Sequence, residues 1–161
     1  MQINYTALVL AIIGAGGIFT GCNPSYTADE VVRHLTLTQS RFFVADADLL
    51  EKVAQRVVSS GLPVSHIFQM SNQGQVLNPN FPSFQDLFKH GKAMWATFST
   101  PEEARSTTAA LLSTSGTSGL PKAAMQSHDS FICQSKMIDD NAEKDYEVRQ
   151  DLSYPSLKLH C

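Results

Sequence analysis

A segment rich in glycine and hydroxyl side chains limits the possible structures of this chain more than any other feature of the sequence. An apolar run lies on each side of it. Thr107–Leu112 leads into the segment and Ala123–Met125 follows it, which is the pattern of two short strands joined by a loop. Between them, residues 113–122 read Ser-Thr-Ser-Gly-Thr-Ser-Gly-Leu-Pro-Lys. We therefore expect a strand-loop-strand unit here.

The composition of this loop suits the binding of a phosphate group. Gly116 and Gly119 can adopt backbone angles that are closed to other residues, so main-chain N–H groups can approach an anion closely. Pro121 fixes its own φ angle at the exit of the loop. The remaining groups are hydroxyl donors and one positive charge, supplied by Ser115, Thr117, Ser118 and Lys122.

The residues of the loop allow two other interpretations. A Walker A loop requires glycine directly before the lysine, whereas Leu120 and Pro121 stand before Lys122, so an ordinary P-loop ATPase is disfavoured. A flexible Ser/Thr/Gly linker has the same composition and stays open on the residues alone.

Composition limits the class of protein. The 161 residues are 43% hydrophobic and 17% charged, which is ordinary for one modest globular domain. A net charge of -3 provides no basic surface for nucleic acid. Cys22, Cys133 and Cys161 are widely spaced and form no zinc-binding pattern, so no metal site and a reducing compartment, the cytoplasm, are expected.

The N-terminal apolar run predicts a buried helix at Asn4–Ala15 and a short strand at Gly17–Gly21. A signal peptide is the less favoured alternative, because no lysine or arginine precedes Arg33. The run is also too short, and too interrupted by glycine, to predict a membrane span.

Residues 27–70 alternate between helical and strand patterns. Thr27 and Glu30 form a capping box for a helix that reaches about Gln39, with His34 on its polar, solvated side. The residues of this helix that are expected to face the core are Val31, Val32, Leu35 and Leu37. Asp46 caps a second helix, Ala47–Ser60, which Gly61 ends. Its apolar residues at helical spacing are Leu49, Leu50, Val53, Val57 and Val58. Strands are expected before and after it, at Arg41–Ala45 and Val64–Met70. This rhythm predicts an α/β fold with a mostly parallel sheet and flanking helices.

The second half of the chain predicts two more helices. A short one is expected at Ser83–Lys89 and a longer one at His128–Met137, capped by Ser127, with His128 in a structural role. The charged run Asp139–Asp145 is interpreted as a solvated loop.

Two stretches resemble a known family. Leu111–Lys122, followed by Ser127 and His128, resembles the signature loop of the adenylate-forming superfamily, which includes acyl-CoA synthetases, luciferases and 4-coumarate:CoA ligase-like enzymes. Ala123 stands where glycine is common. Ala15–Thr27 resembles the segment upstream of that loop in the 4-coumarate:CoA ligase-like branch.

The resemblance implies an incomplete, internal part of the N-terminal AMP-binding domain over residues 1–161, with 1–138 family-like and 139–161 a charged, divergent tail. It implies ATP-dependent activation of a carboxylic acid, with ATP, Mg²⁺ and, in full-length relatives, CoA. The residues implied to bind ATP are Thr114, Ser115, Gly116, Thr117, Ser118, Gly119 and Lys122.

Which acid is activated is not indicated, and catalytic residues stay unassigned. Full-length relatives of this kind can also be peroxisomal. The alternative hypothesis is a catalytically inactive remnant, or an interaction protein that associates with a full-length relative.

Overall fold

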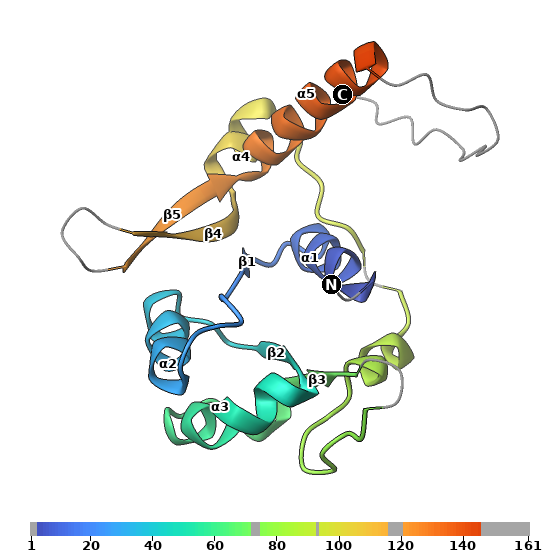
Figure 1. Ribbon diagram of the computed structural model, residues 1–161. Coiled ribbons are helices and arrows are strands. Elements are labelled where there is room, and N and C mark those ends of the chain that lie inside the picture. The colour runs from blue at the N-terminus through green and yellow to red at the C-terminus, as the bar shows by residue number, and fades with distance from the viewer. Residues whose placement is uncertain (1–2, 72–74, 93, 116–120, 146–161) are drawn as a thin grey trace.

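The computed structural model describes residues 3–71, 75–92, 94–115 and 121–145. Figure 1 shows two groups of elements, one formed by α2, α3, β2 and β3 and the other by α4, α5, β4 and β5, with α1 and β1 between them. The helices are α1 Ile3–Gly14, α2 Ala28–Leu37, α3 Ala47–Ser59, α4 Pro101–Ser106 and α5 His128–Asp145, with 3-10 helices at Val64–His66 and Phe84–His90. The strands are β1 Phe19–Thr20, β2 Phe43–Asp46, β3 Ile67–Met70, β4 Thr108–Ser115 and β5 Pro121–Ser127.

Side-chain caps start α2 and α3 as the sequence predicts. The backbone N–H of Glu30 donates to Thr27 Oγ1 over 3.3 Å, and the Thr27 N–H donates to Glu30 Oε2 over 2.8 Å. Asp46 accepts from the Asp48 N–H over 3.1 Å. Gly61, with φ of +100°, follows the end of α3 in a conformation that favours glycine. The predicted capping box is therefore confirmed, and the predicted ends of the two helices, about Gln39 and Ser60, lie within two residues of the observed ends, Leu37 and Ser59.

The main core lies between α2, α3 and the parallel pair β2–β3. Phe43 pairs with Ile67 and Asp46 with Met70, and α3 connects the two strands. The predicted parallel strands with a crossover helix are thus confirmed. The burial of aliphatic side chains is the main stabilising contribution of this core. The most deeply buried of them are Val31, Leu50, Val53, Val57 and Ile67.

The second sheet has the order β1–β4–β5. β1 runs parallel to β4, with Thr20 opposite Leu111, and β4 runs antiparallel to β5. The predicted strand-loop-strand unit is therefore an antiparallel hairpin, which extends to the left in Figure 1. The α/β class is confirmed, with two small sheets in which two of the three strand pairs are parallel.

Three local predictions are wrong. No described side chain of α1 is buried, although the run was expected to form a buried helix, and Leu10 is 57% exposed. Leu37, at the end of α2, is 43% exposed because it lies beyond the last turn that contacts the core. The charged run Asp139–Asp145 belongs to α5 and not to a loop.

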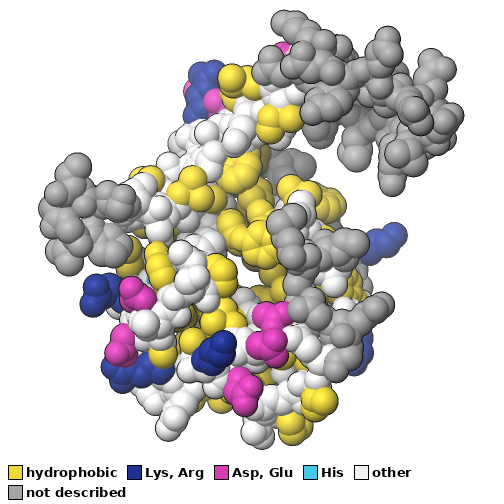
Figure 2. Space-filling model, in the orientation of Figure 1, with side chains coloured by type: hydrophobic (Ala, Val, Ile, Leu, Met, Phe, Trp, Pro, Cys, Tyr) yellow, Lys and Arg dark blue, Asp and Glu magenta, His cyan; other side chains and the backbone are white. Residues whose placement is uncertain are grey.

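Hydrophobic side chains also gather on the surface. Figure 2 shows them in a band between the two groups of elements, over the position of α1 in Figure 1. None of the helices in the described part of the chain is long and apolar enough to cross a membrane.

Candidate functional site

The β4–β5 hairpin positions both ends of the predicted phosphate-binding loop. Thr114 lies opposite Lys122, and Ser115 lies opposite Pro121. The Thr114 hydroxyl donates to the Lys122 carbonyl oxygen over 3.4 Å, and both side chains are exposed. The hairpin register therefore places a threonine and a lysine opposite each other near the end of β4 and the start of β5.

The centre of the predicted site lies outside the described residues. Gly116, Thr117, Ser118 and Gly119 fall in the range 116–120, which the structure does not describe. Phosphate binding by these four residues, and by Thr114, Ser115 and Lys122, stays a prediction.

His34 joins the hairpin to α2 and β1, a role that the sequence interpretation missed. Its side chain was expected to be solvated, but the residue is only 5% exposed. Nε2 lies 3.0 Å from Thr20 Oγ1, and Nδ1 lies 3.1 Å from Ser113 Oγ. The expectation was wrong because α2 is covered on this side by β1 and β4. The spacing of three residues from buried Val31 was the available signal.

The environment of His34 disfavours a charged ring. Burial lowers the pKa of His34 below its ordinary value. The Tyr26 ring lies next to it, with 6.5 Å between the ring centroids. A neutral imidazole offers one donor and one acceptor, which matches two hydroxyl partners without adding a buried charge.

His128 occupies the start of α5, directly after β5. Its ring is 7% exposed and packs on Phe98, with 4.5 Å between the ring centroids. Its backbone N–H donates to the Thr107 carbonyl oxygen over 3.1 Å. Burial lowers the pKa of His128, and its Nε2 has no hydrogen-bond partner within the described residues. These contacts support the structural role expected for it.

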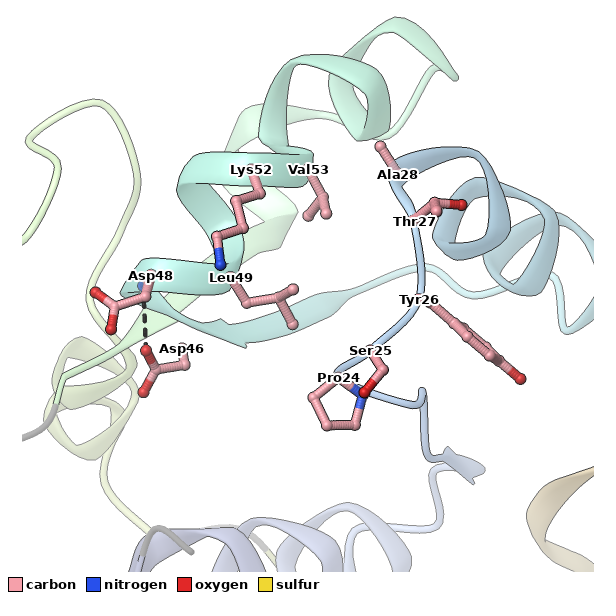
Figure 3. Close-up of a pocket in the computed structure, with 10 residues that line it drawn as sticks. All are labelled: Pro24, Ser25, Tyr26, Thr27, Ala28, Asp46, Asp48, Leu49, Lys52 and Val53. Atoms are coloured by element: carbon pink, nitrogen blue, oxygen red, sulfur yellow. Dashed lines mark hydrogen bonds between the residues drawn. The ribbon is translucent and has the colours of Figure 1, made fainter.

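A surface pocket of about 510 Å³ lies away from the hairpin, between the segment that follows β1 and the first turns of α3 (Figure 3). Two carboxylates and one ammonium group line it, those of Asp46, Asp48 and Lys52. The Asp46 carboxylate caps α3, and Gln75 Nε2 donates to Asp46 over 3.3 Å and to Asp48 over 2.8 Å. The two carboxylates would repel a phosphate group, so this pocket is a less favourable phosphate site than the hairpin.

The described residues contain no group of three or more His, Cys, Asp or Glu side chains placed to hold a metal ion. Mg²⁺ is commonly held by substrate phosphates together with one or two carboxylates.

Comparison with known sequences identifies relatives along almost the whole chain. A model of the AMP-binding enzyme family matches residues 1–157. The acyl-CoA ligase azaF and the phenylacetyl-CoA ligase epaB, both of Aspergillus niger, are each 34% identical over 156 residues, which cover 96% of this chain. The chain spans 29% of the length of either ligase.

Solved structures agree with this result. The fold is similar to that of MatB from Rhodopseudomonas palustris without ligand, with a TM-score of 0.66 and 26% identity over 87% of this chain and 25% of MatB. ATP-bound MatB gives a TM-score of 0.63 at the same identity and coverage. Sequence and fold therefore agree that this chain belongs to the AMP-binding enzyme family.

Proposed function

We propose that this chain supplies the ATP phosphate-binding loop of an enzyme that activates carboxylic acids as acyl-adenylates. In this proposal the loop is a set of backbone N–H, hydroxyl and ammonium donors around the β- and γ-phosphates. The residues that provide them are Thr114, Ser115, Gly116, Thr117, Ser118, Gly119 and Lys122.

The observation that carries the proposal is the register of the β4–β5 hairpin. Thr114 is paired with Lys122, so a lysine and a threonine flank the two ends of a segment rich in glycine and hydroxyl groups. A lysine ammonium is a mobile point charge suited to phosphate oxygens. Backbone N–H groups of a glycine-rich turn can add donors that need no side chain.

The proposed chemistry requires accurate placement of ATP. A carboxylate oxygen attacks the α-phosphorus, the bond from that phosphorus to the bridging oxygen breaks, and pyrophosphate leaves. Groups that hold the β- and γ-phosphates align this displacement and stabilise the charge on the leaving group. When bound, Mg²⁺ neutralises phosphate charge. In the proposal the metal accompanies the nucleotide.

The names of the relatives support a thiol ligase. AzaF is named an acyl-CoA ligase, epaB a phenylacetyl-CoA ligase, and one MatB structure is described as ATP-bound. We therefore propose CoA as the acyl acceptor of the whole enzyme and an organic acid as its substrate. We also propose residues 1–138 as the family-like part and 139–161 as a divergent tail. The free thiols of Cys22 and Cys133 support a reducing, cytoplasmic location.

A second candidate function is association with another protein, such as a full-length relative, without catalysis. The apolar side chains exposed on the described surface favour it, among them Leu10, Met125, Met137 and Ile138. Clustered apolar surface often marks a protein–protein contact. Co-expression with a full-length relative, followed by size-exclusion chromatography, distinguishes a stable complex from independent chains.

Calorimetric titration of the full chain with ATP and Mg²⁺ tests the first proposal. We expect saturable binding that is lost in Lys122→Ala and in Gly116→Val. Lys89→Ala is the matched control, because Lys89 is an exposed lysine paired with Asp86, outside the hairpin. Absence of binding by folded wild-type protein, or equal binding by Lys122→Ala and Lys89→Ala, contradicts the proposal.

A further inference from the structure

Among the described residues, no strand pairs with the outer half of β4 on the side opposite β5. β1 consists of Phe19–Thr20, and its pairing with β4 ends where Thr20 meets Leu111. β4 continues to Ser115 with β5 on its other side. The residues that lead into the predicted phosphate-binding loop therefore lie beyond the end of the β1–β4 pairing.

His34 provides a connection at this point. It belongs to α2, which the Val31 and Leu35 side chains anchor in the main core. Its two ring nitrogens contact Thr20 at the end of β1 and Ser113 two residues further along β4 than Leu111. β1 therefore fixes β4 through backbone pairing as far as Leu111, and the buried His34 ring contacts β4 beyond that point through the Ser113 side chain.

The three contacts together determine which group donates and which accepts in each hydrogen bond of this network. Thr20 Oγ1 donates its single proton to the Leu111 carbonyl oxygen, 3.0 Å away. The Thr20 oxygen must therefore accept from His34 Nε2–H. In the neutral ring Nδ1 is then the acceptor, and the Ser113 hydroxyl donates to it. One tautomer satisfies all three contacts.

We propose that His34 is a positioning residue for the phosphate-binding loop, acting through Thr20 and Ser113 to fix the end of β4. The inference rests on the proposed function, because the loop is assigned there to ATP. Ser113 immediately precedes Thr114, the residue opposite Lys122. A change in the position of Ser113 therefore moves the threonine at the start of the loop relative to the lysine at its end.

Three variants separate positioning from simple loss of stability. His34→Leu removes both hydrogen bonds, whereas His34→Gln keeps one donor and one acceptor on a planar group. Leu35→Ala is the control, since Leu35 is the next residue of α2, is 8% exposed and packs in the core without joining the network. Affinity for ATP with Mg²⁺ is measured by calorimetry, at a temperature where thermal melting shows each variant folded.

We expect His34→Leu to weaken ATP binding about tenfold. His34→Gln should stay within about threefold of wild type, and Leu35→Ala should melt earlier but bind ATP with unchanged affinity. Unchanged affinity in His34→Leu overturns the inference. Equal loss of affinity in His34→Leu and Leu35→Ala also overturns it, because that result reports stability alone.

Hydrogen exchange tests positioning without relying on ATP. Successive residues of a strand point their N–H groups to opposite sides, so one of the Thr114 and Ser115 amides faces β5. In His34→Leu that amide should exchange at least about tenfold faster than in wild type, while the amides of α3 keep their rates. Nitrogen chemical shifts of the wild-type ring should show the proton on Nε2. Unchanged exchange, or a proton on Nδ1, overturns the inference. Wild-type protein that shows the exchange effect but does not bind ATP refutes the proposed function and leaves the positioning role intact.

Discussion

Thr27 and Glu30 cap the N-terminus of α2 reciprocally, each accepting a hydrogen bond from the backbone N–H of the other. The Thr27 hydroxyl also donates to Glu30 Oε2 over 2.8 Å. These bonds satisfy N–H groups that have no partner inside the helix. Since α2 carries His34, this cap supports the helix that connects the core to the hairpin.

Loss of the cap should destabilise the fold measurably. We expect Thr27→Ala to lower the free energy of unfolding by about 1 kcal/mol, because the first turn of α2 loses its side-chain acceptor. Thr36→Ala is the control. Thr36 lies on the same helix, and its exposed hydroxyl donates to the Val32 carbonyl oxygen without capping an end. Urea denaturation of both variants measures the difference, and equal effects would contradict the capping role.

Stability should fall in mildly acidic solution because of His34 and His128. Burial lowers the pKa of both rings below 6.5, so the unfolded chain takes up protons at a pH where the folded chain does not. Their contribution is complete above about pH 6.5 and is lost as the pH falls from there toward the folded pKa values. Melting temperatures at a series of pH values test this. The double variant His34→Gln/His128→Gln should show a flatter profile below pH 6.5, and an unaltered profile would count against the assignment.

Binding of ATP should depend on ionic strength through Lys122. In the proposed site this lysine is an exposed charge facing phosphate oxygens, and salt screens such interactions over about 8 Å at 0.15 M and about 3 Å at 1 M. We expect affinity to decrease as sodium chloride is added. The decrease should be smaller for Lys122→Met, which keeps an unbranched side chain without the charge. Parallel salt dependences would show that Lys122 does not face the nucleotide.

The single tryptophan reports on the packing of α1. The indole of Trp95 lies against Gly14, and the Ala96 N–H donates to the Gly14 carbonyl oxygen over 2.7 Å. A methyl group at Gly14 would overlap the indole ring, so Gly14→Ala should displace Trp95 and shift its fluorescence emission. Gly61→Ala is the comparison. Its methyl group meets open space, so it should strain the backbone and leave the emission of the folded protein unchanged.

Local sequence signals predicted the elements of the main core. The caps at Thr27 and Asp46 and the stop at Gly61 were readable because each involves groups only a few residues apart. The apolar spacing of α3 predicted its buried side: Leu50, Val53 and Val57 are buried, and Leu49 and Val58 are partly buried at the edge of the core. The helix–strand rhythm then predicted the parallel pairing of β2 and β3.

The side chains of α1 and α2 show where these signals fail. The apolar pattern of α1 indicates that the helix can be buried, but it does not indicate which elements would cover it. In the structure no described side chain of α1 is buried. His34 looked like a polar residue on the solvated side of α2. Its burial depends on Thr20 and Ser113, which lie 14 and 79 residues away in the sequence.

By itself, the sequence determined the helix caps and most of the helices and strands, because hydrogen bonds within a helix, cap or turn join near neighbours. It also carried the family resemblance in residues 111–122. Only the tertiary structure decided that β1 pairs with β4 and that His34 lies between them. Those contacts bring together α2, β1 and β4 from distant parts of the chain, and their energy depends on burial that no short stretch of sequence contains.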